Sequence, residues 1–239
     1  PMLAFGWLFN IVERGRASSD RIERMLAIEP EIKDAKEAAT SVSSPELHVG
    51  IKRFIYDTQP VLQEIDVTLK PGKSLGIVGK TGAGKSTFVR LLSREYDVKQ
   101  GAITIGGRDI KQLTRDTVRR QVAIVPQDHF LFSASIADNI AFAKPDASME
   151  DIMEAARIAA VHEDILGFKE GYATMVGERG VTLSGGQKQR ISIARALLAD
   201  CPILVLDDAL SAVDAKTEEA IIHHFRTADH DQAQIIVAH

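Results

Sequence analysis

A glycine-rich segment at residues 79–86 restricts the possible folds of this chain more than any other stretch. It reads Gly-Lys-Thr-Gly-Ala-Gly-Lys-Ser and matches the pattern G-x-x-x-x-G-K-[S/T]. The apolar run SLGIV precedes it and the helix-forming stretch FVRLLSREY follows it, which is the context that this pattern requires. The glycines let successive N–H groups face phosphate oxygens, and the next helix adds its positive N-terminal end. The segment therefore predicts nucleotide binding.

Two side chains at the end of this loop have specific expected roles. We expect Lys85 to reach the β- and γ-phosphates and to assist their transfer, and the Ser86 hydroxyl to bind Mg²⁺. ATP and Mg²⁺ are therefore the expected cofactors. The expected phosphate-binding residues are Gly79, Lys80, Thr81, Gly82, Ala83, Gly84, Lys85, Ser86 and Thr87.

A second candidate site follows the apolar run ILVL, which ends in Asp207 and Asp208. This pattern is typical of a buried strand that delivers carboxylates to the C-terminal edge of a sheet, where ligands bind in open α/β folds. Asp207 is the expected Mg²⁺ ligand, and Asp208 lies where a general base or a water-positioning group is needed. The alternative is a structural pair of acids at a strand end.

The order of apolar runs predicts the fold class. From residue 49, short β-like runs alternate with helical stretches, which favours an α/β domain on a largely parallel sheet. Residues 128–200 have long helical patterns instead, and we expect them to form a helical subdomain inserted between two strands. Residues 35–48 are small and polar and indicate a linker.

Composition excludes several classes of protein. The chain has 239 residues, of which 45% are hydrophobic, so it can build a core. Its net charge of −4 argues against a nucleic-acid partner. It contains one cysteine, Cys201, which cannot form an internal disulfide and which we expect to be a small core residue. The sequence has no apolar run of about 18 residues, the length needed to span a bilayer.

The segment Leu183-Ser184-Gly185-Gly186-Gln187 opens a predicted helix and carries the family resemblance. By chemistry alone it is a second anion-binding helix start, with two glycines that expose N–H groups and a serine hydroxyl; the alternative is an ordinary capped helix. Together with the loop at residues 79–86 and the ILVLDD strand, LSGGQ resembles the signature of the ABC ATPases. The resemblance implies a P-loop NTPase (RecA-like) core with an antiparallel β subdomain and an inserted ABC-type α-helical subdomain.

The resemblance also implies roles for residues that spacing alone does not assign. Gln127 is similar to the glutamine that contacts Mg²⁺ and the attacking water, and His239 to the histidine that contacts the γ-phosphate. Residues 211–214 resemble the loop that follows the acidic strand in this family. Tyr56 is similar to the aromatic residue that stacks on adenine, although alone it could be a core aromatic. In ABC dimers each nucleotide also meets the other chain's signature, here Ser184, Gly185, Gly186 and Gln187.

Three further segments resemble ABC exporters, specifically bacterial multidrug-resistance-like half-transporters: residues 176–180, 130–142 and 1–26. The apolar start of the chain is compatible with a surface helix, but the resemblance makes residues 1–34 the end of the last transmembrane helix and its cytoplasmic extension. Residues 49–239 would be the ATP-binding domain, truncated at its C-terminal end. The fragment itself would be soluble, and the complete transporter would lie at the cytoplasmic face of the cell membrane.

The implied partners are an identical or paralogous half-transporter and the coupling helices of the missing transmembrane domain. ATP would join two such domains, and its hydrolysis would drive export of a drug- or lipid-like substrate. An ABC ATPase acting on DNA or ribosomes is an alternative, which the acidic balance and the apolar start disfavour.

Asp208 departs from the family pattern, in which this position is usually Glu. A carboxylate drawn back by roughly 1.5 Å polarises the same water poorly, and small misplacements can cost about 100-fold in rate. The alternative is therefore a weakly hydrolysing subunit that binds ATP and completes a partner chain's active site. His129, His162, His223, His224 and His230 match no motif position, and we assign them no role.

Overall fold

The computed structural model describes residues 2–56, 58–177, 182–211, 213, 217–219, 221–223 and 231–238. It divides into two compact units, Pro1–Lys33 and Asp34–His239, and each is described by itself.

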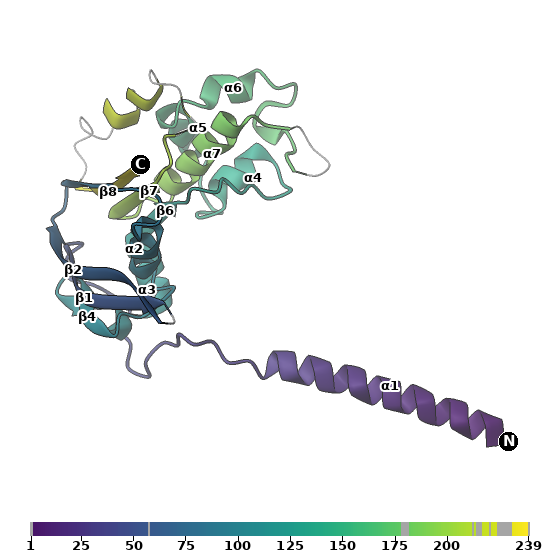
Figure 1. Ribbon diagram of the computed structural model, residues 1–239. Coiled ribbons are helices and arrows are strands. Elements are labelled where there is room, and N and C mark those ends of the chain that lie inside the picture. The colour runs from purple at the N-terminus through teal and green to yellow at the C-terminus, as the bar shows by residue number, and fades with distance from the viewer. Residues whose placement is uncertain are drawn as a thin grey trace. The chain divides into compact units, whose positions relative to one another are not determined.

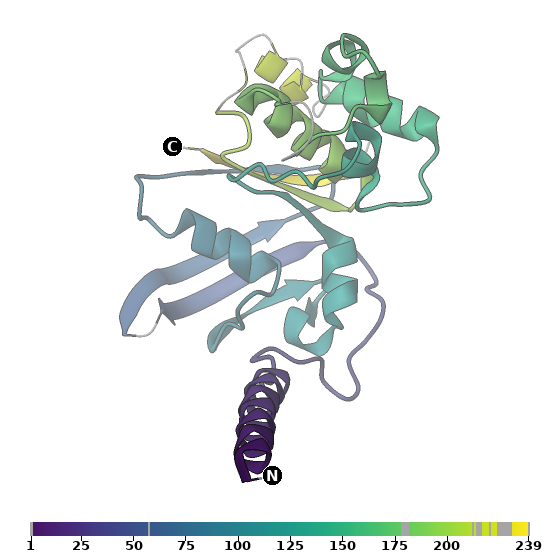
Figure 2. The ribbon, with the colours of Figure 1, turned by 90° about the vertical axis from the view of Figure 1, so that its right-hand side faces the viewer.

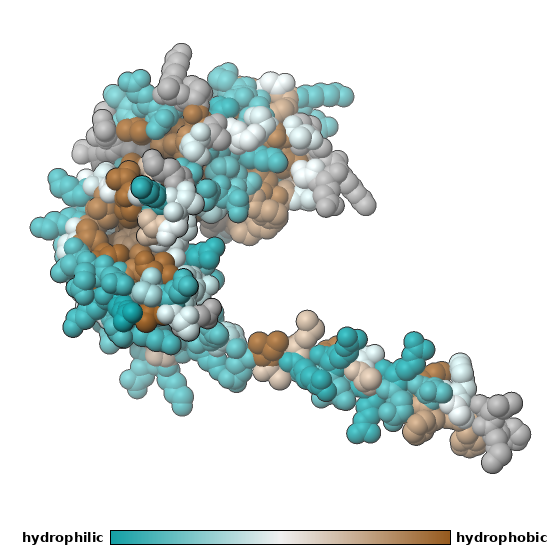
Figure 3. All heavy atoms as spheres, viewed as in Figure 1, coloured by the Kyte–Doolittle hydropathy of each residue, from teal (hydrophilic) through white to brown (hydrophobic). Residues whose placement is uncertain are grey.

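The first unit contains the helix α1 (Met2–Leu26). Hydrophobic and hydrophilic residues are interspersed along it (Figure 3), and its apolar side chains from Phe5 onward are exposed, with Trp7 at 70%. In the described part of the chain, no helix combines the length and the apolar character that crossing a membrane requires.

The second unit contains the remaining elements. Its strands are β1 (Leu47–Tyr56), β2 (Gln59–Leu69), β3 (Ser74–Val78), β4 (Gln100–Ile105), β5 (Arg108–Asp109), β6 (Val122–Val125), β7 (Ile203–Asp207) and β8 (Ala233–Ala238). Its helices are α2 (Lys85–Leu92), α3 (Arg115–Gln121), α4 (Ile136–Ala141), α5 (Met149–Ile158), α6 (His162–Leu166) and α7 (Gly185–Leu198), with 3₁₀ turns η1 (Ile110–Gln112) and η2 (Gly171–Ala173).

The strands form two sheets of different type. An antiparallel sheet has the order β2-β1-β4-β5, and a parallel sheet has the order β3-β8-β7-β6. Helices α2 and α3 lie between the two sheets, and α4 to α7 cover the other face of the parallel sheet (Figures 1 and 2). Strand β1 begins at Leu47, inside the segment that we expect to be a linker.

Strand β7 explains why both faces of the parallel sheet must be covered. All five of its residues are buried. Ile203 and Val205 pack into the core that includes α2 and the antiparallel sheet, whereas Leu204 and Leu206 pack into the core of the helical layer. Because side chains of a strand alternate between faces, an unbroken apolar strand requires a layer on each side.

The helical layer is an insertion between two strands of the parallel sheet. Helices α4 to α7 follow β6 and precede β7 in the chain, so the inserted subdomain is confirmed. Three of these helices begin at serine caps, Ser135, Ser148 and Ser184, whose hydroxyl groups accept the backbone N–H three residues later. Such caps satisfy N–H groups that have no partner within the helix.

Asn139 connects this subdomain to the segment that follows β6. Its side chain is fully buried; its Oδ1 accepts from the Phe132 N–H (2.8 Å) and from Arg195 Nη2 (3.0 Å). Its Nδ2 donates to the carbonyls of Phe132 and Ser135, each at 3.0 Å. Arg195 also lies over the rings of Phe132 and Phe142, and burial lowers its pKa. One amide therefore joins the post-β6 segment, α4 and α7.

We expect the substitution Asn139→Ala to destabilise the protein by about 3 kcal/mol, because it leaves several buried polar groups without partners. Urea unfolding would measure the change in the free energy of unfolding. Asp146→Ala, at an exposed loop position in the same subdomain, is the control and should change it by less than about 0.5 kcal/mol. Equal effects of the two substitutions would contradict the role of Asn139.

Candidate nucleotide-binding site

The parallel sheet brings the predicted site residues to one edge. Val78 pairs with Ala238, and Asp207 pairs with Val237, so the C-terminal ends of β3, β7 and β8 are level. Val125, at the end of β6, pairs with Leu206. The segments that leave this edge therefore begin close together, although they are far apart in the sequence.

The glycine-rich loop leaves β3 at this edge and enters α2. Gly82 and Gly84 adopt left-handed backbone conformations, with φ of 83° and 89°, which favour glycine. A Cβ atom on Gly84 would lie 2.8 Å from Leu62 Cδ2 and 3.0 Å from the Val61 carbonyl. Strand β2 therefore packs closely against the loop. Both the left-handed backbone conformation and the lack of space for a Cβ atom restrict position 84 to glycine.

The Lys85 side chain forms hydrogen bonds to backbone carbonyls of the loop. Its ammonium group donates to the carbonyls of Gly79 and Lys80, the latter at 3.3 Å. Gly84 is the N-cap of α2 and offers no side-chain cap, so the N–H groups of the first turn face the loop. Ser86 lies in this first turn and is exposed. The loop thus presents an ammonium group, backbone N–H groups and a hydroxyl.

Two carboxylates lie at the end of β7, at the same edge: Asp207 is its last residue and Asp208 follows it. Asp207 is 8% exposed and ends the strand. Asp208 has a φ of 51°, and its N–H donates to the Val237 carbonyl (3.1 Å) while its carbonyl accepts from Ser211 Oγ (2.9 Å). Aspartate and asparagine tolerate this left-handed conformation better than longer side chains. The local backbone therefore favours aspartate at position 208.

Gln127 is exposed in the segment that leaves β6, at the sheet edge where the carboxylates lie. His129, to which the sequence assigns no role, lies nearby. Burial lowers its pKa, while the negative charges of Asp128 and Asp208 oppose that shift. No sequence pattern indicates this proximity, because the pairing of β6 with β7 brings positions 129 and 208 together.

Tyr56 ends β1 and belongs to an aromatic cluster. Its ring contacts those of Phe54 and Tyr96 edge-on, at centroid distances of 5.2 and 5.0 Å. Burial, followed by the neighbouring Tyr96, raises the pKa of Tyr56. Phe54 pairs across the sheet with Leu62, which contacts the glycine-rich loop. Tyr56 therefore lies on the strand pair that packs against this loop.

The LSGGQ segment forms the start of α7 with a closed capping box. Ser184 Oγ accepts the Gln187 N–H (3.2 Å), and Gln187 Oε1 accepts the Ser184 N–H (3.0 Å). Gln187 Nε2 donates to Asp164 on α6. Within the described residues, these side-chain hydrogen bonds run to each other and to α6, and none runs to the glycine-rich loop.

Several predicted residues lie outside the described residues. One is His239. Ala212 and Asp214 belong to the segment that resembles the family's loop after the acidic strand, and residues 178–180 belong to the segment that resembles an exporter loop. In the part of the chain that the structure describes, no group of three or more His, Cys, Asp or Glu residues could hold a metal ion.

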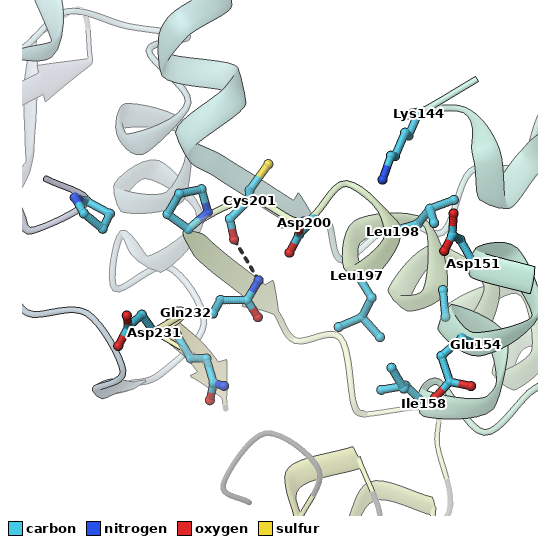
Figure 4. Close-up of a pocket in the computed structure, with 14 residues that line it drawn as sticks. Lys144, Asp151, Glu154, Ile158, Leu197, Leu198, Asp200, Cys201, Asp231 and Gln232 are labelled. Carbon is cyan, nitrogen blue, oxygen red and sulfur yellow. Dashed lines mark hydrogen bonds between the residues drawn. The ribbon is translucent and has the colours of Figure 1, made fainter. Parts of the chain in front are cut away.

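A cavity of about 670 Å³ lies at the opposite edge of the sheet (Figure 4). Cys201 and Gln232, which precede β7 and β8, line it, and Gln232 Nε2 donates to the Cys201 carbonyl (2.7 Å). Burial raises the pKa of the Cys201 thiol to about 11, so it is an unreactive thiol near neutral pH. Because Cys201 and Gln232 precede their strands, this cavity is separate from the edge that carries the predicted site, which lies where the strands end.

Comparison with known proteins identifies related chains. The Escherichia coli (strain K12) multidrug resistance-like ATP-binding protein MdlA is 49% identical over 241 residues, covering 100% of this chain and 41% of that protein. The probable multidrug resistance ABC transporter ATP-binding/permease protein YheI of Bacillus subtilis (strain 168) is 44% identical, with the same coverage. This chain therefore spans about two fifths of the length of these relatives.

A solved structure supports the fold. The structure of a bacterial Atm1-family ABC exporter with ATP bound matches 98% of this chain and 41% of its own, with a TM-score of 0.91 and 37% identity. The described sheets and inserted helices thus form the nucleotide-binding fold of ABC transporters, as the sequence predicts. The ABC transporter family model matches residues 62–211, more than half of the chain. The chain belongs to the ABC transporter family.

Proposed function

We propose that this chain is the ATP-binding domain of an ABC exporter, in which it binds Mg-ATP and hydrolyses it. The observation that carries the proposal is the common sheet edge from which the glycine-rich loop, Gln127 and Asp207 all emerge. The similarity to a bacterial exporter with ATP bound supports the same conclusion.

The loop at residues 79–86 would bind the phosphates of ATP. Its N–H groups and the start of α2 supply hydrogen-bond donors, and Lys85 supplies a positive charge at the centre of the loop. Tyr56, on the strand pair beside the loop, would contact the adenine. In this arrangement the triphosphate is fixed before any bond breaks, which is the main contribution of a protein to phosphoryl transfer.

The residues at this edge fit a magnesium ion. Mg²⁺ prefers oxygen ligands and is usually held by one or two protein groups together with the phosphates of the nucleotide. The Ser86 hydroxyl, the Asp207 carboxylate and the Gln127 amide oxygen are such ligands, and they come from three segments that meet here. The ion would neutralise charge on the β- and γ-phosphate oxygens.

Asp208, with His239 and Gln127, would orient the attacking water. The water oxygen bonds to the γ-phosphorus as the bond to the β–γ bridging oxygen breaks, and Asp208 accepts a hydrogen bond from the water. Lys85 stabilises the charge that builds on the leaving oxygen.

A second chain would complete each site. The side chains at the start of α7 bond to each other and to α6, so the first-turn N–H groups of Gly185 and Gly186 remain for a ligand brought by another chain. We propose a head-to-tail dimer of this chain with an identical or paralogous chain. Closure and reopening of the dimer would move the membrane part at the cytoplasmic face of the membrane. Residues 1–34 would connect the two parts.

The backbone at Asp208 supports one refinement of this function. Its left-handed conformation suits aspartate, so the shorter carboxylate is compatible with the local structure rather than forced upon it. We propose that the site on this chain's own loop hydrolyses ATP slowly, while its signature completes a faster site on a partner chain.

Lys85→Ala should abolish ATP binding at this site and lower phosphate release about 100-fold, because the loop loses its central charge. Phosphate release with Mg-ATP, measured over a range of protein concentrations, tests this. Lys73→Ala, at an exposed position before β3, is the matched control and should behave like the parent. Full activity of Lys85→Ala would rule out this loop as the ATP site.

Asp208→Glu should raise phosphate release about tenfold, because the longer side chain brings the carboxylate nearer the water. The gain should appear although Glu is less favourable at a φ of 51°. Asp208→Asn serves as the control. Because the parent already hydrolyses ATP slowly, this variant should still release phosphate at a small fraction of the parent's rate. A parent with strong turnover that rises cooperatively with protein concentration, and no gain with Glu, would contradict the slow-site refinement.

Gly185→Ala should lower turnover at least tenfold without lowering stability or the affinity of the chain's own loop for ATP. A Cβ atom there would meet nothing within 4 Å, so the chain itself tolerates it, and only a nucleotide on a partner chain would be displaced. Gly15→Ala has the same open surroundings and is the control. Turnover, thermal unfolding and binding of a fluorescent ATP analogue separate these effects; unchanged turnover would argue against action on a second chain.

A further inference from the structure

The start of α7 is intrinsically weak. Two glycines occupy its first turn, and each costs up to about 1 kcal/mol of helix stability relative to alanine. The first turn also contains no acidic residue, so the favourable interaction of a carboxylate with the helix dipole is missing there. The order of the signature turn (residues 184–187) therefore depends on its Ser184–Gln187 capping box and on the side chains outside the turn that hold this box.

The Gln187 side chain connects this turn to α6 by hydrogen bonds. Its Oε1 accepts the Ser184 N–H, and its Nε2 donates to Asp164 Oδ1 at 3.0 Å. The oxygen and the nitrogen of the Gln187 amide are thus each held by a different partner, Ser184 and Asp164. Asp164 thereby orients the capping box through Gln187, although it belongs to a different helix.

Arg190, one turn along α7, engages the other oxygen of the same carboxylate. Its Nη1 donates to Asp164 Oδ2 at 2.8 Å and to the Ala160 carbonyl, and its Nε donates to the Gly186 carbonyl at 3.3 Å. The side chains of Arg190 and Asp164 are only 16% and 31% exposed. Hydrogen bonds from one ion pair therefore reach Gly186 directly and Ser184 through Gln187.

The charge arrangement suits a turn that receives phosphate. A carboxylate within the first turn would stabilise the helix but repel an anionic ligand. Asp164 supplies the hydrogen bonds from α6 instead, and Arg190 balances its charge. The turn is ordered without gaining net negative charge.

Helix α6 also has an anchor that does not involve α7. His162 Nδ1 and the Tyr172 hydroxyl form a hydrogen bond of 2.8 Å between α6 and η2. Its loss would loosen the same subdomain without touching the signature turn, so Tyr172→Phe provides a control for purely structural effects.

We propose that Asp164 and Arg190 are positioning residues that set the geometry and the charge of the signature turn toward the γ-phosphate bound on a second chain. Arg190 fixes the carboxylate, the carboxylate fixes Gln187, and Gln187 fixes Ser184. This inference rests on the proposed function, because it assigns the pair a role in that ATP hydrolysis.

The test compares Asp164→Asn, Arg190→Gln and Tyr172→Phe in steady-state ATP hydrolysis. Asp164→Asn should lower kcat about tenfold without raising KM, because the turn is misplaced while Arg190 keeps its positive charge nearby. Arg190→Gln should raise KM for ATP as well, because the charge of Asp164 is no longer balanced, and the rise should shrink at high salt. Tyr172→Phe should lower the unfolding temperature but leave kcat and KM unchanged.

Two readouts separate positioning from loss of structure. Binding of a fluorescent ATP analogue to dilute protein should be unchanged in all three variants, since the chain's own loop is intact. Asp164→Glu should recover more activity than Asp164→Asn, whereas Arg190→Lys should recover little, because lysine lacks the planar fork that reaches several acceptors. Equal changes in kcat and KM for Asp164→Asn, Arg190→Gln and Tyr172→Phe would overturn the proposal.

A spectroscopic measurement distinguishes failure of this inference from failure of the proposed function. In NMR spectra, Asp164→Asn should shift the side-chain amide signals of Gln187 and the backbone amides of Gly185 and Gly186, and Tyr172→Phe should not. A parent protein without ATPase activity that shows these shifts would refute the proposed function while the geometric inference stands. Absence of the shifts would overturn the inference whatever the activity.

Discussion

The pairing of β7 between β6 and β8 is the constraint on which the site depends. Its five buried residues require a packed layer on each face, and its register places Asp207 level with the ends of β3 and β8. The hydrogen bonds of a parallel sheet fix this register. They therefore bring the loop at residues 79–86 and the carboxylates to the same edge, although β3 and β7 each pair with β8 and not with each other. The proposed nucleotide site thus lies at the sheet edge where β3, β6 and β7 end.

The helical layer is organised by polar side chains as much as by its core. Helices α4 and α6 have six and five residues, too few to be stable alone. Asn139 and Arg195 join α4 to α7 at one place, and Asp164 and Arg190 join α6 to α7 at another. Polar networks of this kind, buried at Asn139 and half-buried at Asp164 and Arg190, specify one arrangement, because any other leaves charges or amides without partners.

Some parts of the site were predictable from local sequence and others were not. The roles expected of Lys85 and Gly84 follow from a short pattern whose geometry is built into consecutive residues. The positions of His129 beside Asp208 and of Asp164 beside Gln187 follow from no pattern, since they depend on how distant segments pack. The left-handed backbone at Asp208, which makes aspartate suitable there, is likewise visible only in the structure.

The α/β class, the inserted helical region and the residues of the glycine-rich loop could be predicted from local sequence. These features are encoded by neighbours along the chain, through apolar runs, glycine positions and helix caps. The order of the strands, the side chains near Asp208 and the contacts that order the start of α7 became visible in the folded structure alone. Those outcomes depend on contacts between residues as far apart as positions 78 and 238, and local preferences carry no information about such pairs.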